Sequence, residues 1–284
     1  MAEQITAVAV RDYALSSCAP AGVASIVVAP VGAVAAPVTV LLPGWGLGKE
    51  SMLGAAYRMA AGGCVAVVPD LWLHGERAEP GGFTHRVGDV YPARSGLDEA
   101  VLFHRVVAQT VDDVTAVLDA LDGDPRCDVS RVGLVGYCVG GYAAYALFAR
   151  MKRISAAAAL HAVPTFTRRW IDMVDEACGA DPARAAAIHS QPGATADYTA
   201  FVDRIDPAAD LADAGARALL MLTGSRDTTH PTHYTVEHHR RLVSHWGDHP
   251  ERLRLALLDE GHRYSAEAEK LATAWVLAHL DDEG

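Results

Sequence analysis

The chain passes from a strand to a helix within VGLVGYCVGG, residues Val132–Gly141, where a short apolar run breaks at Gly-x-Cys-x-Gly-Gly and an Ala-rich helical pattern follows. A nucleophile on such a sharp turn needs neighbours without side chains, because the backbone folds tightly around it. Gly136 and Gly140 meet this need, and Gly141 lets the helix approach the sheet. A buried cysteine in a glycine-rich packing turn is the simpler alternative. The context along the chain favours a nucleophile elbow with Cys138 at its tip.

Strand-like and helix-like apolar patterns alternate along most of the chain. Strands are predicted for 23–29, 38–42, 65–68, 131–135, 154–160, 218–222 and 253–258, and helices for 51–61, 97–121, 139–150, 234–246 and 266–280. This alternation is typical of a mostly parallel, doubly wound α/β sheet. The carboxyl ends of such strands lie along one edge, where ligands bind.

Two segments interrupt the alternation. Residues 71–96 are rich in Gly, Pro, His and Arg and read as a long loop. Residues 162–216 contain two short helical patterns, 167–178 and 182–189, and are far longer than one helical crossover requires. We therefore expect one α/β domain, residues 1–284, in which 162–216 form a small helical cap over the active-site edge.

Two further candidate catalytic residues follow predicted strands in the order nucleophile, acid, histidine. Asp227 comes after the strand 218–222, and His262 comes after the last strand. A carboxylate in this position accepts the imidazole N–H and fixes its tautomer. A helix-capping aspartate and a solvated loop histidine are the ordinary alternatives for each residue alone. Their joint order predicts a Cys138–His262–Asp227 triad. We expect Asp227 to orient His262, and not Asp259 or Glu260, which are close to the histidine in sequence.

An acyl-transfer site also needs two backbone N–H groups directed at the developing oxyanion. Val139, directly after the candidate nucleophile, offers one at the start of its helix. The loop after the strand 38–42 offers a second at Trp45, within Pro43-Gly44-Trp45-Gly46. The alternative is that these glycines serve only a tight turn and that Trp45 is a packing anchor.

Substrate-contacting residues are less sharply indicated. Candidates are His74 and Arg77 in the long loop, Tyr137 beside the nucleophile and Trp170 on the expected cap. The loop also carries further residues suited to binding a carboxylate or phenol: His85, Arg86, Tyr91 and Arg94. Most of these residues have ordinary explanations as solvated loop or core side chains.

Composition narrows the partners. The net charge of −11, the isoelectric point of about 5.6 and the lack of a Lys/Arg cluster argue against nucleic acid and against anionic membranes, and favour a small-molecule substrate. The first four residues lack a basic segment, and no apolar stretch approaches the ~20 residues of a membrane helix. We expect a cytoplasmic protein, with a homodimer compatible with the sequence.

Neither cysteine nor histidine spacing suggests a metal site. The five cysteines are widely spaced without a C-x-x-C pair, so four of them read as apolar fillers and no disulfide framework is indicated. A histidine-dense stretch raises a metal hypothesis: His230, His233, His238, His239 and His245. A helix places His238 and His239 on different faces, so we predict no metal site and no cofactor.

With these residues in place, the chain resembles the α/β-hydrolase superfamily over nearly its whole length, and its cysteine elbow resembles the dienelactone hydrolase branch. Val68-Pro69-Asp70-Leu71 and Gly136-Tyr137-Cys138 carry the local likeness. The resemblance implies a Cys–His–Asp triad, no cofactor and hydrolysis of lactones or small esters. The branch usually carries a glutamate in its oxyanion loop, which Pro43–Gly46 lacks. The stretch 73–77 and the helical insertion look more like peptidase-related esterases, and the elbow is also similar to that of polyhydroxyalkanoate synthases.

The function expected is hydrolysis of a small ester, lactone or thioester through an acyl-cysteine intermediate. A thiolate is easily expelled, which favours substrates with good leaving groups. Two alternatives stay open. The same triad would serve an acyltransferase or cyclase if the cap excludes water, and the fold would also suit a small-ligand receptor that does not turn over.

Overall fold

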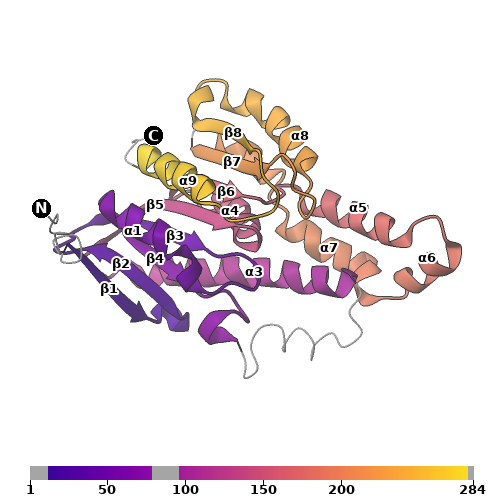
Figure 1. The fold of residues 1–284 in the computed structure, drawn as a ribbon, viewed down its shortest axis with the longest axis horizontal. Coiled ribbons are helices and arrows are strands. Elements are labelled where there is room, and N and C mark those ends of the chain that lie inside the picture. Colours follow the sequence, from indigo (N-terminus) through magenta and orange to yellow (C-terminus); the bar gives the residue numbers. More distant parts are fainter. Residues whose placement is uncertain (1–11, 79–95, 216, 281–284) are drawn as a thin grey trace, which may run out of the picture.

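A computed structural model describes residues 12–78, 96–215 and 217–280 (Figure 1). Within these ranges one sheet has the strand order β1-β2-β4-β3-β5-β6-β7-β8. β1 pairs antiparallel with β2, β2 pairs antiparallel with β4, and the remaining neighbours are parallel. The strands are β1 (Tyr13–Cys18), β2 (Ser25–Pro30), β3 (Ala36–Leu42), β4 (Val65–Pro69), β5 (Cys127–Tyr137), β6 (Ile154–Leu160), β7 (Ala218–Gly224) and β8 (Leu253–Leu258). The predicted mostly parallel α/β sheet is confirmed.

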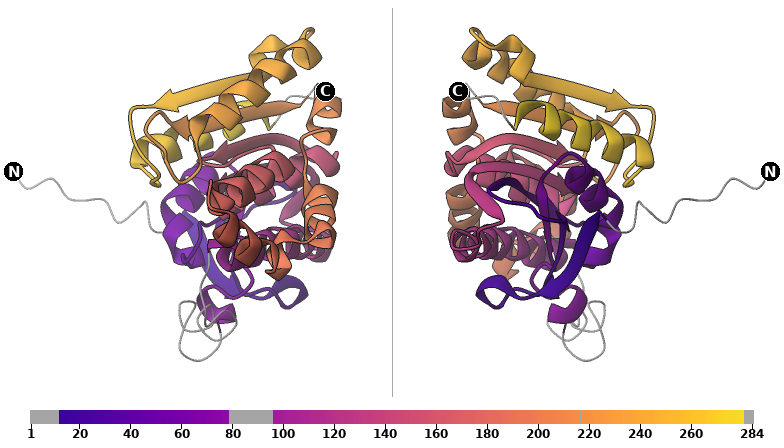
Figure 2. Two further views of the ribbon diagram at one scale, coloured as in Figure 1. Left: turned by 90° about the vertical axis from the view of Figure 1, so that its right-hand side faces the viewer. Right: turned by 90° about the vertical axis from the view of Figure 1, so that its left-hand side faces the viewer.

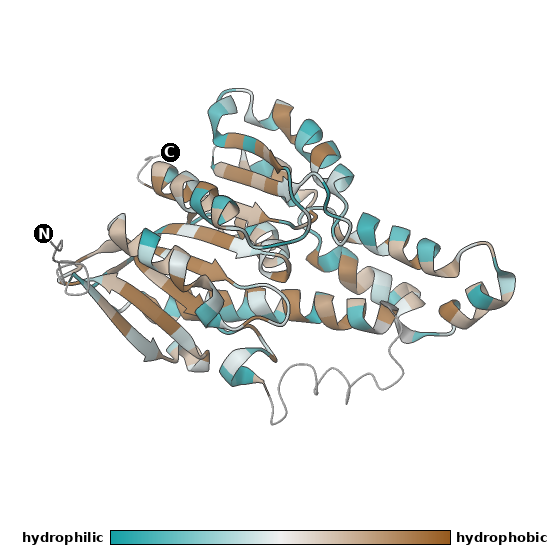
Figure 3. Cartoon of the chain, viewed as in Figure 1, coloured by the Kyte–Doolittle hydropathy of each residue, from teal (hydrophilic) through white to brown (hydrophobic). Residues whose placement is uncertain are grey.

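Helices cover both faces of this sheet (Figure 2). α1 (Leu53–Ala61) and α9 (Ala266–His279) pack on one face, while α3 (Gly96–Leu121), α4 (Val139–Arg150) and α8 (Thr232–Leu242) pack on the other. The central strands are therefore buried on both sides, which explains their continuous apolar runs. β4 reads VAVVP and is buried throughout, and Figure 3 shows the hydrophobic colour concentrated on these strands.

Three helices lie between β6 and β7, and Figure 1 shows them extending beyond the sheet. They are α5 (Phe166–Cys178), α6 (Pro182–His189) and α7 (Ala196–Ile205), joined to short 3-10 turns at Pro192–Ala194 and Asp210–Ala214. α5 buries one face, which includes Phe166 and Trp170, against the rest of the chain. The segment expected to form a helical insertion is thus helical, and α7 is an addition to the two predicted helices.

The apolar core follows this layering, one cluster on each face of the sheet. No helix in the described part of the chain is both long and apolar enough to span a membrane.

Candidate active site

Cys138 occupies a strained backbone position between β5 and α4. Its φ of 54° and ψ of −119° are unusual for a residue with a side chain, and such a conformation costs on the order of 1–3 kcal/mol. The glycines make it possible: a Cβ on Gly136 would lie 2.1 Å from the carbonyl oxygen of Gly140, and one on Gly140 would lie 2.4 Å from that of Leu42. The sequence thus folds here into the elbow that the glycine spacing predicts, with the thiol at its tip.

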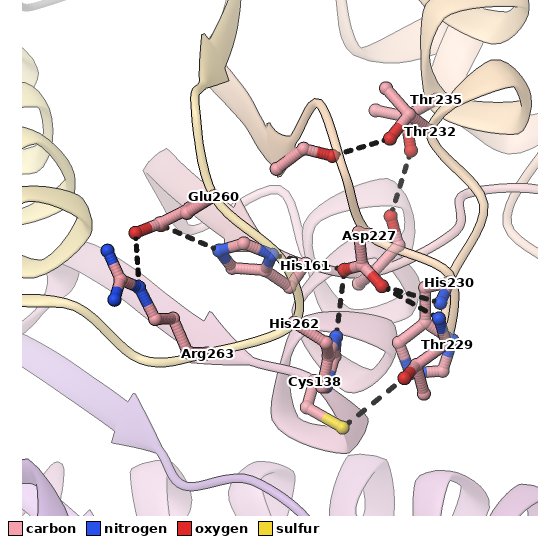
Figure 4. Close-up of polar contacts among 12 residues, drawn as sticks. Cys138, His161, Asp227, Thr229, His230, Thr232, Thr235, Glu260, His262 and Arg263 are labelled. Carbon is pink, nitrogen blue, oxygen red and sulfur yellow. Dashed lines mark hydrogen bonds and ion pairs between the residues drawn. The ribbon is translucent and has the colours of Figure 1, made fainter.

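Asp227 and His262 meet beside this thiol (Figure 4). Nδ1 of His262 donates to Oδ2 of Asp227 over 2.8 Å. Oδ1 of the same carboxylate accepts the backbone N–H groups of Thr229 and His230 at 3.0 and 2.9 Å. Asp259, by contrast, is exposed and pairs with Arg226. The structure places the predicted acid and histidine together and leaves Asp259 outside the contact.

The sulfur of Cys138 is flanked by two imidazoles, not one. Nε2 of His230 lies 3.6 Å from Sγ, and a ring nitrogen of His262 lies within 4.8 Å of both atoms. Burial raises the pKa of Cys138, but the imidazoles of His230 and His262 outweigh it and bring the pKa to about 6. Burial lowers the pKa of His262, whereas Asp227 and Cys138 raise it to about 9. This arrangement stabilises a thiolate beside a protonated imidazole near neutral pH.

His230 was missed as a site residue by the sequence analysis. It lies in the turn after β7, where its backbone N–H donates to the carboxylate of Asp227. Its Nδ1 lies 3.2 Å from the Tyr142 hydroxyl. Its place three residues after the candidate acid was the available signal. The other histidines of the dense stretch lie on α8 and the following 3-10 turn: His233, His238, His239 and His245.

His161 is a second residue that sequence reasoning missed. It follows β6 with a φ of 48° and is fully buried. Its Nδ1 lies 3.1 Å from Oδ2 of Asp227, and its Nε2 lies 3.3 Å from Oε1 of Glu260. Burial raises the pKa of Asp227, but hydrogen bonds from His161 and His262 hold it well below its usual range. Glu260, considered above only as a rival acid, therefore contacts Asp227 through His161.

The two predicted oxyanion residues also lie beside the thiol. Val139 is the first residue of α4, directly after Cys138. The loop that carries Trp45 passes close to the elbow, since a Cβ on Gly44 would lie 3.4 Å from the Cβ of Cys138. Trp45 and Cys138 line the same cavity. Both backbone N–H groups therefore belong to segments that border the candidate nucleophile.

A cavity of about 290 Å³ opens onto Cys138 and His230. Its other described lining residues come from the loop after β3, from α3, from α5 and from the turn after β7: Trp45, Glu99, Ala100, Phe103, Met173 and Thr229. Most of this lining is apolar. Glu99, Thr229 and His230 are its polar members, Glu99 is the one acidic residue among them, and no lysine or arginine occurs among these described lining residues.

None of the four tentative substrate-contacting residues is among the described lining residues of this cavity. His74 is fully buried with Nδ1 on the carbonyl of Trp72, and Arg77 binds Asp113 and the carbonyl of Asp70. Both side chains therefore contact the loop that carries them, and their contact with a substrate stays a prediction.

Tyr137 and Trp170 also lie outside the described lining of the cavity. The Tyr137 ring stacks on His262 at a centroid distance of 5.4 Å, so it supports the imidazole. Trp170 is buried against His104 and Tyr198, and Met173, one turn further along α5, reaches the cavity instead. The predicted loop contacts His85, Arg86, Tyr91 and Arg94 lie outside the described residues.

Comparison with known sequences places the chain in one protein family. Residues 23–233 match the model of the Dienelactone hydrolase family. The chain is also 24% identical over 227 residues to the "Putative esterase YitV" of Bacillus subtilis, covering 77% of this chain and 79% of that protein.

Solved structures share the fold at low sequence identity. A Thermus thermophilus protein superposes with a TM-score of 0.66 at 21% identity, covering 95% of this chain and 99% of its own. The Pyrococcus furiosus esterase superposes with a TM-score of 0.57 at 14% identity, covering 94% and 93%. The architecture is that of the α/β-hydrolases.

Proposed function

Since this chain belongs to the dienelactone hydrolase family, we propose that it hydrolyses small neutral esters, thioesters and strained lactones through an acyl-cysteine intermediate on Cys138. One observation carries the proposal: the thiol stands at a strained elbow between two imidazoles, one of which Asp227 holds at 2.8 Å. Nucleophile, base and orienting acid in this order are the arrangement that activates a weak nucleophile for acyl transfer.

Acylation begins with the thiolate of Cys138. Its sulfur forms a bond to the carbonyl carbon, and the carbonyl electron pair moves to the oxygen. The backbone N–H groups of Val139 and Trp45 stabilise the resulting oxyanion. When the pair returns, the carbon–oxygen or carbon–sulfur bond to the leaving group breaks, and His262 gives its proton to that group.

Deacylation uses the same residues in reverse. Neutral His262 takes a proton from water while the water oxygen attacks the thioester carbon. The tetrahedral intermediate then expels the thiolate and releases the carboxylic acid. Asp227 keeps Nδ1 of His262 protonated throughout, so Nε2 is the nitrogen that exchanges the proton.

His230 supports the thiolate state in this scheme. Its ring is fixed at the far side by the Tyr142 hydroxyl and presents Nε2 to the sulfur. Two imidazoles share the stabilisation of one sulfur, so the thiolate is stabilised both before it attacks and when the thioester expels it.

The cavity supports a small, neutral acyl group. Its volume of about 290 Å³ suits a short chain or small ring, and Trp45, Phe103 and Met173 supply apolar walls. Glu99, an exposed residue that lines the cavity, disfavours substrates that carry a negative charge, because like charges repel, and this effect is weakened by solvent screening.

The test is steady-state hydrolysis of p-nitrophenyl and thioester substrates that differ in acyl length and charge. We expect turnover that is fastest for short neutral acyl groups and is abolished in Cys138→Ala. Cys178→Ala is the matched control, because this buried thiol lies on α5 away from the elbow. This variant should leave turnover unchanged. Full hydrolysis by Cys138→Ala would overturn the proposal, and failure of every substrate in the panel would favour a receptor.

A further inference from the structure

Cys138, His230 and His262 form a cluster with the composition of a metal site. One thiol sulfur and one nitrogen from each imidazole lie within 4.8 Å of one another. We propose that this cluster binds a single thiophilic divalent cation, with Zn²⁺ as the representative ion, and that the bound ion shuts off hydrolysis reversibly. Ion binding rests on the donor geometry alone, whereas the inhibition rests on the proposed function.

The donor spacing suits tetrahedral zinc. Zinc lies about 2.3 Å from a cysteine sulfur and about 2.0 Å from an imidazole nitrogen, so a tetrahedral angle separates the two donors by about 3.5 Å. Sγ of Cys138 and Nε2 of His230 lie 3.6 Å apart. These two donor atoms therefore have the separation that a bound zinc ion requires. The ring nitrogen of His262 lies within 4.8 Å of both and would have to move slightly closer.

Each imidazole also has the outer partner that metal-bound histidines usually have. Nδ1 of His262 donates to Asp227 at 2.8 Å, and Nδ1 of His230 lies 3.2 Å from the Tyr142 hydroxyl. These contacts orient both rings by their Nδ1 atoms, so Nε2 is the ligand atom that each ring offers (Figure 4). Partners of this kind strengthen metal binding by fixing tautomer and ring orientation.

The site is reachable and has room for a fourth ligand. Cys138 and His230 both line the cavity of about 290 Å³, so an ion enters by the substrate's route. Three protein donors with one position open to water is a common zinc arrangement. Spacing along the sequence gives no sign of this site, because its donors come from three separate segments: the elbow, the turn after β7 and the segment after β8.

Occupancy and hydrolysis exclude each other. A bound ion takes the sulfur lone pair that attacks the carbonyl and the Nε2 lone pair through which His262 exchanges a proton. The ion thus blocks both steps at once, and a chelator that removes it restores both groups.

The binding test uses Co²⁺ as a spectroscopic substitute on chelator-treated protein. We expect one equivalent to give a sulfur-to-cobalt charge-transfer band, and Zn²⁺ to displace Co²⁺. His230→Gln and Cys138→Ser should each weaken Zn²⁺ binding about tenfold or more, with unchanged circular dichroism. The control is His189→Gln, which removes the imidazole of a second cysteine–histidine pair, Cys178 Sγ to His189 Nε2 at 3.7 Å, and should leave both band and affinity unchanged.

The outcomes separate the two claims. No charge-transfer band, or a band that survives Cys138→Ser, overturns the metal site while hydrolysis without metal leaves the proposed function standing. A band with undiminished hydrolysis at saturating Zn²⁺ overturns the inhibition and removes Cys138 as nucleophile. Zn²⁺ inhibition that a chelator reverses, and that His230→Gln weakens in parallel with binding, supports both.

Discussion

Nε2 of His230 faces Sγ of Cys138 at 3.6 Å, while Nδ1 of the same ring lies 3.2 Å from the Tyr142 hydroxyl. Because both ring nitrogens of His230 have a partner, the ring has a fixed orientation next to the thiol. His230→Gln should raise the pKa of Cys138 and slow iodoacetamide alkylation below pH 6, about tenfold for a rise of one pKa unit.

The control for this change is His233→Gln, three residues further along on the exposed side of α8. It should leave the alkylation profile of Cys138 unchanged. If His230→Gln and the unmodified protein had the same alkylation profile, His230 would have no effect on the pKa of Cys138.

The pH profile of the metal-free protein should have two limits. The pKa of Cys138 is lowered to about 6 and that of His262 is raised to about 9. Alkylation of Cys138 should therefore rise as pH increases through about 6. Hydrolysis should fall above about 9, because His262 then has lost the proton that the leaving group needs. Stopped-flow rates measured in the presence of a chelator check both limits, and an alkylation midpoint near the ordinary thiol value would contradict the first.

Asp227→Asn should lower acylation by roughly 10⁴-fold, the loss typical when a triad acid is neutralised. The asparagine no longer holds the imidazole in its catalytic tautomer. Asp259→Asn is the matched control on the adjacent strand end, because that side chain is exposed and pairs only with Arg226 among the contacts described. If Asp259→Asn were the crippling change, the acid would have to be reassigned.

His161 should matter for stability through its two carboxylate contacts. His161→Phe leaves Glu260, which is 4% exposed, without one of its buried partners, and an unsatisfied buried group costs about 1–3 kcal/mol. We expect a lower melting temperature, partly restored in His161→Phe/Glu260→Gln because the double variant no longer buries that charge. Purely additive losses in this double-mutant cycle would show that the two residues are not coupled.

On α5, we expect Met173 to affect substrate specificity and Trp170 to affect stability. Met173→Ala enlarges the cavity and should shift relative rates toward bulkier acyl groups, with a pocket contact worth roughly tenfold. Trp170→Ala removes a buried ring against Tyr198 and should cost about 3–5 kcal/mol of unfolding free energy. Relative rates across an acyl series, together with urea unfolding, distinguish the two, and a specificity change confined to Trp170→Ala would contradict the placement.

The sheet and the elbow could be predicted from the sequence because both depend on patterns of neighbouring residues. Buried parallel strands are continuous apolar runs, and the glycines around Cys138 are required by backbone contacts that nothing larger would permit. β1 escaped prediction because it is an edge strand with five of its six residues exposed, so no buried face marks it. α7 buries only Val202 and likewise carries a weak pattern.

The missed site residues depend on tertiary contacts. His161 stands after a strand like many loop residues, and only the alignment of β6, β7 and β8 brings Asp227 and Glu260 to its two nitrogens. His230 was grouped with neighbours on α8, although the turn at Asp227 directs it to the elbow instead. Sequence pattern also left two readings open for Trp170, a pocket wall or an ordinary core residue, and the structure buries its ring in the core.

The most direct test of the central claim is acid-quenched single turnover of a p-nitrophenyl ester, followed by peptide mapping. We expect the acyl group to be found as a thioester on Cys138, to appear together with the first equivalent of nitrophenol, and to decay at the rate of steady-state hydrolysis. Turnover with no acylated Cys138 peptide at any quench time, or an acyl group on another residue, would contradict it.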